Sequence, residues 1–140
     1  MSIGTENRNG IIGLSASTDG PGPYIMAADS LTGEKVVSET GTTLGEITHI
    51  MLDVGKGTIA YAVLSFGGFL GIHDKLFAVP WASLALDVEN KWFVLNIEKR
   101  LLRDAPGFDK KHWPAMADAK WAQEVHSYYG PVAVSRRPFI

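Results

Sequence analysis

The chain has 140 residues, a formal net charge of −2 and a sequence pI of about 6.0. This balance lacks the basic patch that nucleic-acid binding usually needs, and the absence of cysteine excludes disulfides and thiolate metal sites. No apolar run reaches the roughly 18 residues of a membrane-spanning helix and no leader pattern is seen, so we expect one cytoplasmic domain.

The two ends of the chain differ from its middle. Residues 1–24 are rich in Ser, Thr, Gly, Asn and Pro and hold few large apolar side chains, and residues 131–140 have a similar mixture. Such segments bury too little apolar surface to offset the entropy of ordering them. We therefore predict flexible tails at 1–24 and 131–140 and one folded domain over residues 25–130.

Short apolar runs separated by glycine-containing turns follow the N-terminal tail. We predict β-strands at residues 35–37, 44–54, 58–66, 75–80, 84–86 and 92–97. Gly41 and the Gly55–Gly57 segment supply the sharp turns between the first three of these strands. Short strands at this spacing predict a small antiparallel β-barrel.

Two of the strands have unusual apolar patterns. In strand 44–54 the apolar residues have both parities, and a bulge between Ile47 and Ile50 would bring them onto one face. Strand 58–66 is apolar at nearly every position, so we expect both of its faces to be covered. One face meets the barrel core, and the other needs a helix, a tail or a second subunit.

The period of the pattern changes to that of helices after residue 97. We predict a short helix at 98–103 and a longer one that begins after Asp118, its N-cap, and ends at Gly130. The helical spacing gives the longer helix one apolar stripe, made of Trp121, Val125 and Tyr128. This stripe is expected to pack on the barrel or on a neighbouring subunit.

Several segments together resemble a known family. They are Leu44–Ile47, Met51–Asp53, Ile59–Ser65, Phe77–Trp81, Ala105–Phe108, Trp113–Pro114 and Tyr128–Gly130. Their order and spacing resemble the PRC-barrel family, in particular its small free-standing bacterial members. The family is named for the cytoplasmic domain of the photosynthetic reaction centre H subunit and is similar to the C-terminal domain of a ribosome maturation factor. The resemblance implies a mainly β fold with a six-stranded antiparallel barrel, short C-terminal helices, no shared catalytic residue, and docking against protein partners.

The candidate partner-binding residues are Phe69, Leu70, His73 and Trp113. Phe69 and Leu70 lie in a glycine-rich turn, where they serve either as an anchor for a partner or as a plug for one end of the barrel. His73 and Asp74 are adjacent, so their side chains point to opposite faces of a strand, which favours a turn hydrogen bond over a catalytic or metal-binding pair. Trp113 lies in a charged loop and is a candidate for surface recognition.

The sequence shows no catalytic motif, so we predict a non-enzymatic protein-interaction or regulatory adaptor module without cofactor or metal. A homodimer or another protein partner would cover its surplus apolar surface. One alternative is a sensor or carrier barrel that holds a small molecule beside Tyr61, Phe66 and Phe77. Another is an RNA-associated or ribosome-associated factor, by analogy with the maturation factor.

Overall fold

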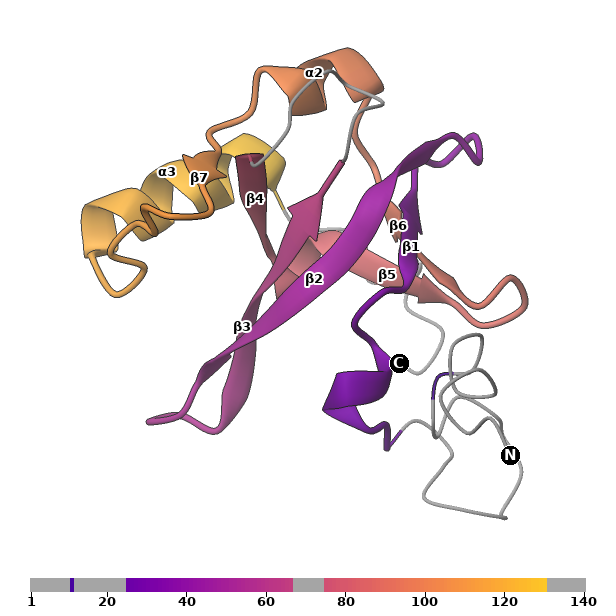
Figure 1. Cartoon of the computed structure of the whole chain (residues 1–140), viewed down its shortest axis with the longest axis horizontal. Helices are drawn as coiled ribbons and strands as arrows, with labels where there is room; N and C mark the ends of the chain where they lie inside the picture. The colour runs from indigo at the N-terminus through magenta and orange to yellow at the C-terminus, as the bar shows by residue number, and fades with distance from the viewer. Residues whose placement is uncertain (1–10, 12–24, 67–74, 131–140) are drawn as a thin grey trace.

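The computed structural model describes residues 11, 25–66 and 75–130, which form a curled β-structure with helices at its border (Figure 1). The strands are β1 (Lys35–Val37), β2 (Thr43–Asp53), β3 (Thr58–Ser65), β4 (Lys75–Pro80), β5 (Leu84–Asp87), β6 (Trp92–Leu95) and β7 (Phe108–Asp109). The helical segments are η1 (Ala28–Ser30), η3 (Trp81–Ser83), α2 (Lys99–Arg103) and α3 (Ala119–Tyr129). The predicted mainly β fold is confirmed.

The seven described strands form one mixed sheet in the order β5-β6-β1-β2-β3-β4-β7. Five neighbouring pairs are antiparallel, and β1 and β6 are parallel. The pairing of the described strands does not close, because β5 and β7 each have a neighbour on one side only. These findings correct the predicted six-stranded antiparallel barrel. The strands β1 to β4 pair in chain order. The η3 segment then leads to β5 at the opposite edge of the sheet, and β6 pairs between β5 and β1, parallel to β1.

Irregular pairing curves β2. Its register with β3 shifts between Ile47 and His49, which confirms the predicted bulge, and shifts again between Met51 and Leu52. Ile47 is therefore buried and Ile50 packs against the same core. The second shift was not predicted. Met51 follows Ile50 directly, so strand alternation places it on the opposite face of the sheet, and Leu52, after the second shift, is 56% exposed. The apolar residues of β2 therefore do not all share one face.

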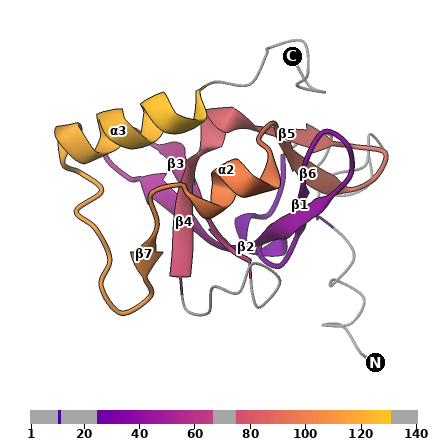
Figure 2. The same ribbon diagram turned by 90° about the horizontal axis from the view of Figure 1, so that it is seen from above.

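The sheet buries side chains on both faces. The main core holds, among others, Leu44, Ile47, Leu64 and Phe77. A smaller group, here called the outer cluster, holds three buried and six partly buried residues: Tyr61, Ala78 and Val125, with Met51, Ala60, Phe108, Met116, Trp121 and Tyr129. β3 therefore has both faces covered, as predicted, and the cover on its outer face is α3, which Figure 2 shows beside β3 and β4.

Local signals in the sequence fix the ends of α3. The Asp118 side chain accepts a hydrogen bond from the backbone N–H of Trp121, at 3.3 Å, and Gly130 has a φ of 68° at the other end. The predicted stripe needs one correction. Trp121 and Val125 pack on the outer cluster as expected, but Tyr129 completes the contact and Tyr128 is 38% exposed.

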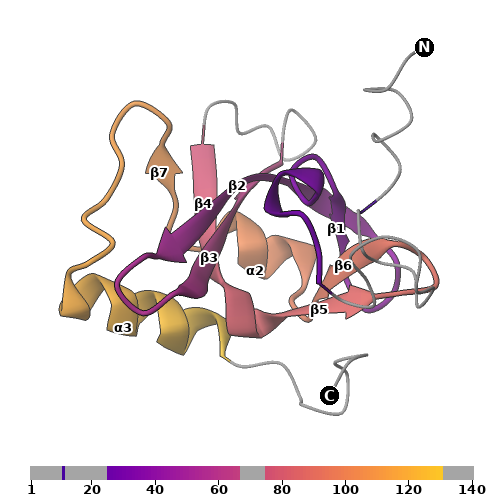
Figure 3. The same cartoon turned by 90° about the horizontal axis from the view of Figure 1, so that it is seen from below.

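No strand was predicted at β7. It pairs with β4 at the edge of the sheet, with Phe108 opposite Leu76 (Figure 3). Ile11, the one described residue of the first 24, is 5% exposed and belongs to the main core.

Candidate functional site

Three of the four candidate partner-binding residues, Phe69, Leu70 and His73, lie outside the described residues. Trp113 is described, in the segment between β7 and α3. Its side chain is 39% exposed, which places it among the more exposed large apolar residues of the described chain. The surface around Trp113 is therefore the predicted site that the structure describes.

Three contacts fix the indole ring of Trp113. Its Nε1–H donates to the backbone oxygen of Lys110, at 2.9 Å. The ring centroid lies 5.2 Å from that of His49 at an interplanar angle of 89°, and 4.9 Å from that of Phe108. We call Trp113, His49 and Phe108 the Trp113 patch. Since edge-to-face contacts of this kind favour one ring orientation, the patch presents a partly exposed aromatic surface that is ordered before any partner binds.

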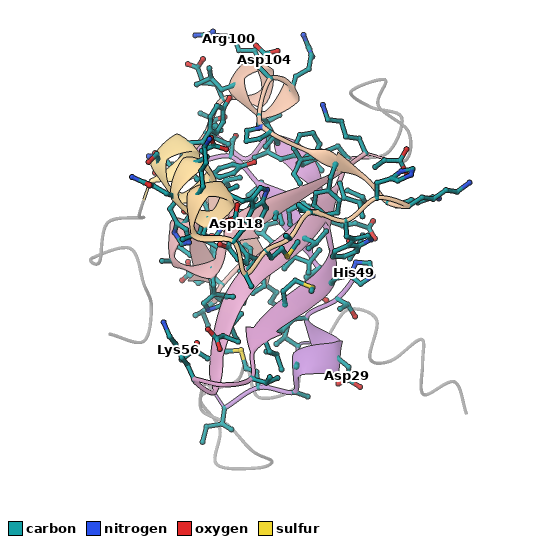
Figure 4. All side chains as sticks on the ribbon, turned by 90° about the vertical axis from the view of Figure 1, so that its left-hand side faces the viewer. Asp29, His49, Lys56, Arg100, Asp104 and Asp118 are labelled. Carbon is teal, nitrogen blue, oxygen red and sulfur yellow. The ribbon has the colours of Figure 1, made fainter. Side chains whose placement is uncertain are left out.

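The segment that carries Trp113 is shaped by Asp109. The Asp109 carboxylate accepts the backbone N–H of Lys111, at 2.8 Å, and the Asp109 carbonyl accepts the backbone N–H of His112 at the same distance. Figure 4 looks onto this side of the molecule, where His49 and Asp118 are labelled. The sequence did not predict His49 and Phe108 as neighbours of Trp113, because β2 and β7 meet Trp113 only after the strands have paired.

A second surface is a groove between α2 and the end of α3. Its volume is about 460 Å³, and it is lined by Asn96, Ile97, Glu98, Arg100, Leu101, Tyr128 and Tyr129. The Tyr128 hydroxyl donates to the backbone oxygen of Leu101 and so ties the two helices together. Leu101 is 39% exposed and Tyr128 is 38% exposed. Glu98 and Arg100 form an ion pair at 3.0 Å on this rim, and both are exposed, so the pair contributes little to stability.

Tyr129, which also lines this groove, has an unusual hydroxyl group. Its hydroxyl is buried and has no hydrogen-bond partner among the described residues. Burial, with a smaller contribution from Tyr128, raises the pKa of Tyr129 far above its ordinary value. The hydroxyl therefore stays neutral.

The three aromatic residues proposed to hold a small molecule do not lie together on one face of the sheet. Tyr61 lies on the outer face of β3, where its hydroxyl is 3.3 Å from Nε2 of His126, and burial raises its pKa. Phe66 and Phe77 pack against each other in the main core, with ring centroids 4.7 Å apart. The predicted shared cavity is thus not formed. A hollow of about 320 Å³ borders Phe66 on the outside, next to Gly45 and Ser65.

Neither a metal-binding cluster nor a membrane-spanning helix is found among the residues that the structure describes. Within residues 11, 25–66 and 75–130, no three His, Asp or Glu side chains lie close enough together to hold a metal ion. In the same ranges, no helix has the length and apolar character needed to cross a membrane.

Comparison with known proteins identifies the family. The model of the PRC-barrel domain matches residues 25–102, which include β1–β6 and most of α2. No curated protein matches the chain. The matched region covers more than half of the 140 residues, and it contains the bulged β2 and the doubly covered β3 that shape the sheet. The chain therefore belongs to the PRC-barrel domain family.

Proposed function

We propose that the chain is a non-enzymatic protein-interaction module that acts as a regulatory adaptor, and that it binds a protein partner through the Trp113 patch. The observation that carries the proposal is an indole ring that is 39% exposed although one hydrogen bond and two ring contacts fix it. A side chain that is ordered before binding loses little entropy on binding. Tryptophan is also among the residue types that contribute most to binding at protein interfaces.

The partner is either a different protein or a second copy of this chain. The sequence-based reason for a homodimer was a surplus apolar face on β3, and α3 covers that face. Among the described surfaces, the Trp113 patch and the α2–α3 groove remain as candidates for a homodimer contact. Light scattering across micromolar concentrations distinguishes these cases, because a monomer throughout removes the second copy from the proposal. The proposed cytoplasmic location is tested separately, by cell fractionation.

The experiment is quantitative affinity purification of the full chain from native extract. Trp113→Ser removes the exposed ring, and Val54→Ser serves as the matched control, because Val54 is 86% exposed but lies in the β2–β3 turn away from the patch. We expect Trp113→Ser to lose at least about tenfold of the bound partner, since a truncated interface hot spot costs roughly 2 kcal/mol or more. Val54→Ser should retain the partner.

Thermal unfolding of each variant excludes a trivial cause. Trp113→Ser is expected to melt cooperatively, because its ring is partly exposed and lies outside the main core. Equal recovery of the partner by the wild-type chain and Trp113→Ser would disprove docking at the patch. Loss of the partner only in a Leu101→Ser, Tyr128→Ser double variant would instead place docking at the α2–α3 groove.

A further inference from the structure

The outer face of the sheet is covered by a part of the chain that follows the matched family region. The family model ends at residue 102, whereas α3 begins at Ala119. Five of the nine residues of the outer cluster lie after residue 102: Phe108, Met116, Trp121, Val125 and Tyr129. The family domain therefore supplies an apolar sheet face, and the segment that follows it fills that face with a helix.

The contacts show what kind of ligand this face accepts. Val125 is 2% exposed against the sheet, and the Trp121 ring lies 5.3 Å from the ring of Tyr61. Nε2 of His126, the residue after Val125, lies 3.3 Å from the Tyr61 hydroxyl. The face thus accepts an amphipathic helix with an aromatic residue, a valine and a second aromatic residue at positions i, i+4 and i+8, a common mode of helix recognition.

The attachment of α3 is uneven along its length. Its C-terminal end is held by two hydrogen bonds: the Ser83 hydroxyl donates to the Gly130 carbonyl, and the Tyr128 hydroxyl donates to the Leu101 carbonyl. Its first two turns are held by Trp121 and Val125. An 11-residue helix is too short to be stable alone in water, so the docking contacts decide whether it forms. Weakening these docking contacts is therefore expected to open α3 locally while the sheet stays folded.

We propose that the outer face of β2, β3 and β4 is a helix-binding surface, that α3 occupies it as an intramolecular ligand, and that a protein partner binds there by presenting an amphipathic helix of the same pattern. The inference deepens the proposed interaction function and rests on it. Since a partner helix must compete with α3, its apparent affinity is its intrinsic affinity multiplied by the fraction of chains in which α3 is undocked. Loosening α3 therefore raises the affinity, while the binding face itself is unchanged.

The test uses the full chain and a fluorescent peptide of residues 116–130 as the probe, with binding followed by anisotropy. We expect the peptide to bind the Val125→Ala chain at least about tenfold more tightly than the wild-type chain, because the intact valine of the peptide competes against a weakened internal helix. Tyr128→Phe removes the hydrogen bond to Leu101 without opening the core, and should raise the affinity by a smaller factor. Gln123→Ala, on the exposed side of α3, should leave it unchanged.

Hydrogen exchange supplies a second measurement that does not depend on the peptide. In the wild-type chain, α3 amides should exchange faster than those of β2 and β3, through an opening that leaves the sheet protected. The proposal is overturned if α3 amides are as protected as those of β3, or if neither Val125→Ala nor Tyr128→Phe increases peptide binding. It is also overturned if a peptide with Val125→Asp binds as well as the native peptide. Phe108 belongs to both the outer cluster and the Trp113 patch, but these measurements leave Trp113 unchanged. A failure here is therefore distinguishable from equal recovery of the partner by Trp113→Ser.

Discussion

Replacing Gly45 by alanine should strongly destabilise the folded sheet, although the change adds only one methyl group. Gly45 lies within β2, opposite Val36 of β1, and its φ is not in the left-handed region. A Cβ atom there would overlap the backbone oxygen of Ser65 and two carbons of the Phe66 ring, with Cε1 at 2.8 Å. Real Cβ atoms essentially never approach other atoms this closely. The glycine is therefore needed for a close approach and not for a special backbone conformation.

The cost follows from what must move. Ser65 contributes a backbone atom of the neighbouring strand, so that part of the clash is relieved only if β2 and β3 separate. The Phe66 ring is buried and packs on Phe77, so moving it exposes a core aromatic side chain. Overpacking costs about 1–3 kcal/mol and exposing an aromatic side chain about 1.5–3 kcal/mol. We expect Gly45→Ala to lower the free energy of unfolding by about 3 kcal/mol.

The assay is thermal and urea unfolding monitored by circular dichroism. A loss of about 3 kcal/mol corresponds to a fall in Tm of roughly 10 °C for a chain of this size. Gly55→Ala is the matched control, because a Cβ at Gly55 would meet only the Asp53 carboxylate, at an ordinary 3.5 Å. Without a clash, the reduced entropy of the unfolded chain leaves that variant unchanged or stabilised by up to about 1 kcal/mol.

A double-mutant cycle with Phe66→Ala separates the two clashes. Phe66→Ala alone should cost about 3–5 kcal/mol, and in that background Gly45→Ala should cost less than in the wild-type chain. The Ser65 clash remains, so the cost should not vanish. If Gly45→Ala melts within about 2 °C of the wild-type chain, then the close approach of β2 to Phe66 does not constrain the sheet and the argument is wrong.

Two further predictions concern pH. Glu34 is 8% exposed, and burial raises its pKa above the ordinary 4.5. The stability that Glu34 contributes is therefore full below pH 4.5 and is lost as pH rises through the folded pKa. Glu34→Gln should gain stability relative to wild type between pH 4 and pH 7 in urea titrations, and a pH-independent difference would contradict this. Asp87 behaves oppositely, because hydrogen bonds, chiefly from the Asn90 side chain, hold its pKa below 3.8. Asp87→Asn should lower the free energy of unfolding by about 1 kcal/mol at pH 7, and this loss should shrink as pH falls through the folded pKa of Asp87. An equal loss at pH 7 and pH 2 would refute the stabilising role of the ionised Asp87.

Most elements of the fold could be predicted because each carries a local signal. The bulge after Ile47 follows from a break in the parity of apolar residues, and the ends of α3 follow from Asp118 and Gly130. The parallel pairing of Val36 with Phe93 could not be predicted, since it joins residues far apart in the sequence and leaves no mark on either strand. β7 is too short to show a period.

Gly107 was the available signal for β7. A Cβ at Gly107 would lie 2.7 Å from Cε of Lys75 and 2.9 Å from the Leu76 oxygen, so this glycine allows the chain to pass close beside β4. Gly107 also lies shortly after the helix predicted at 98–103, where a glycine is a common helix stop. A glycine that follows a helix and precedes an aromatic residue is thus consistent with both a stop and a close approach, and only the partner strand decides between them.

The candidate site was harder to predict than the fold, because an apolar residue in the sequence can pack either within its own chain or against a partner. The outer face of β3 was correctly predicted to need a cover, but the sequence could not distinguish a helix of the same chain from a second subunit. The structure places α3 there, through Val125 and Trp121. Among the residues that the structure describes, the apolar surface left for a partner includes Trp113, fixed by His49, and the rim formed by Leu101 and Tyr128. A partner helix that binds the outer face of β3 must displace α3 from the sheet, because Val125 and Trp121 already occupy that face.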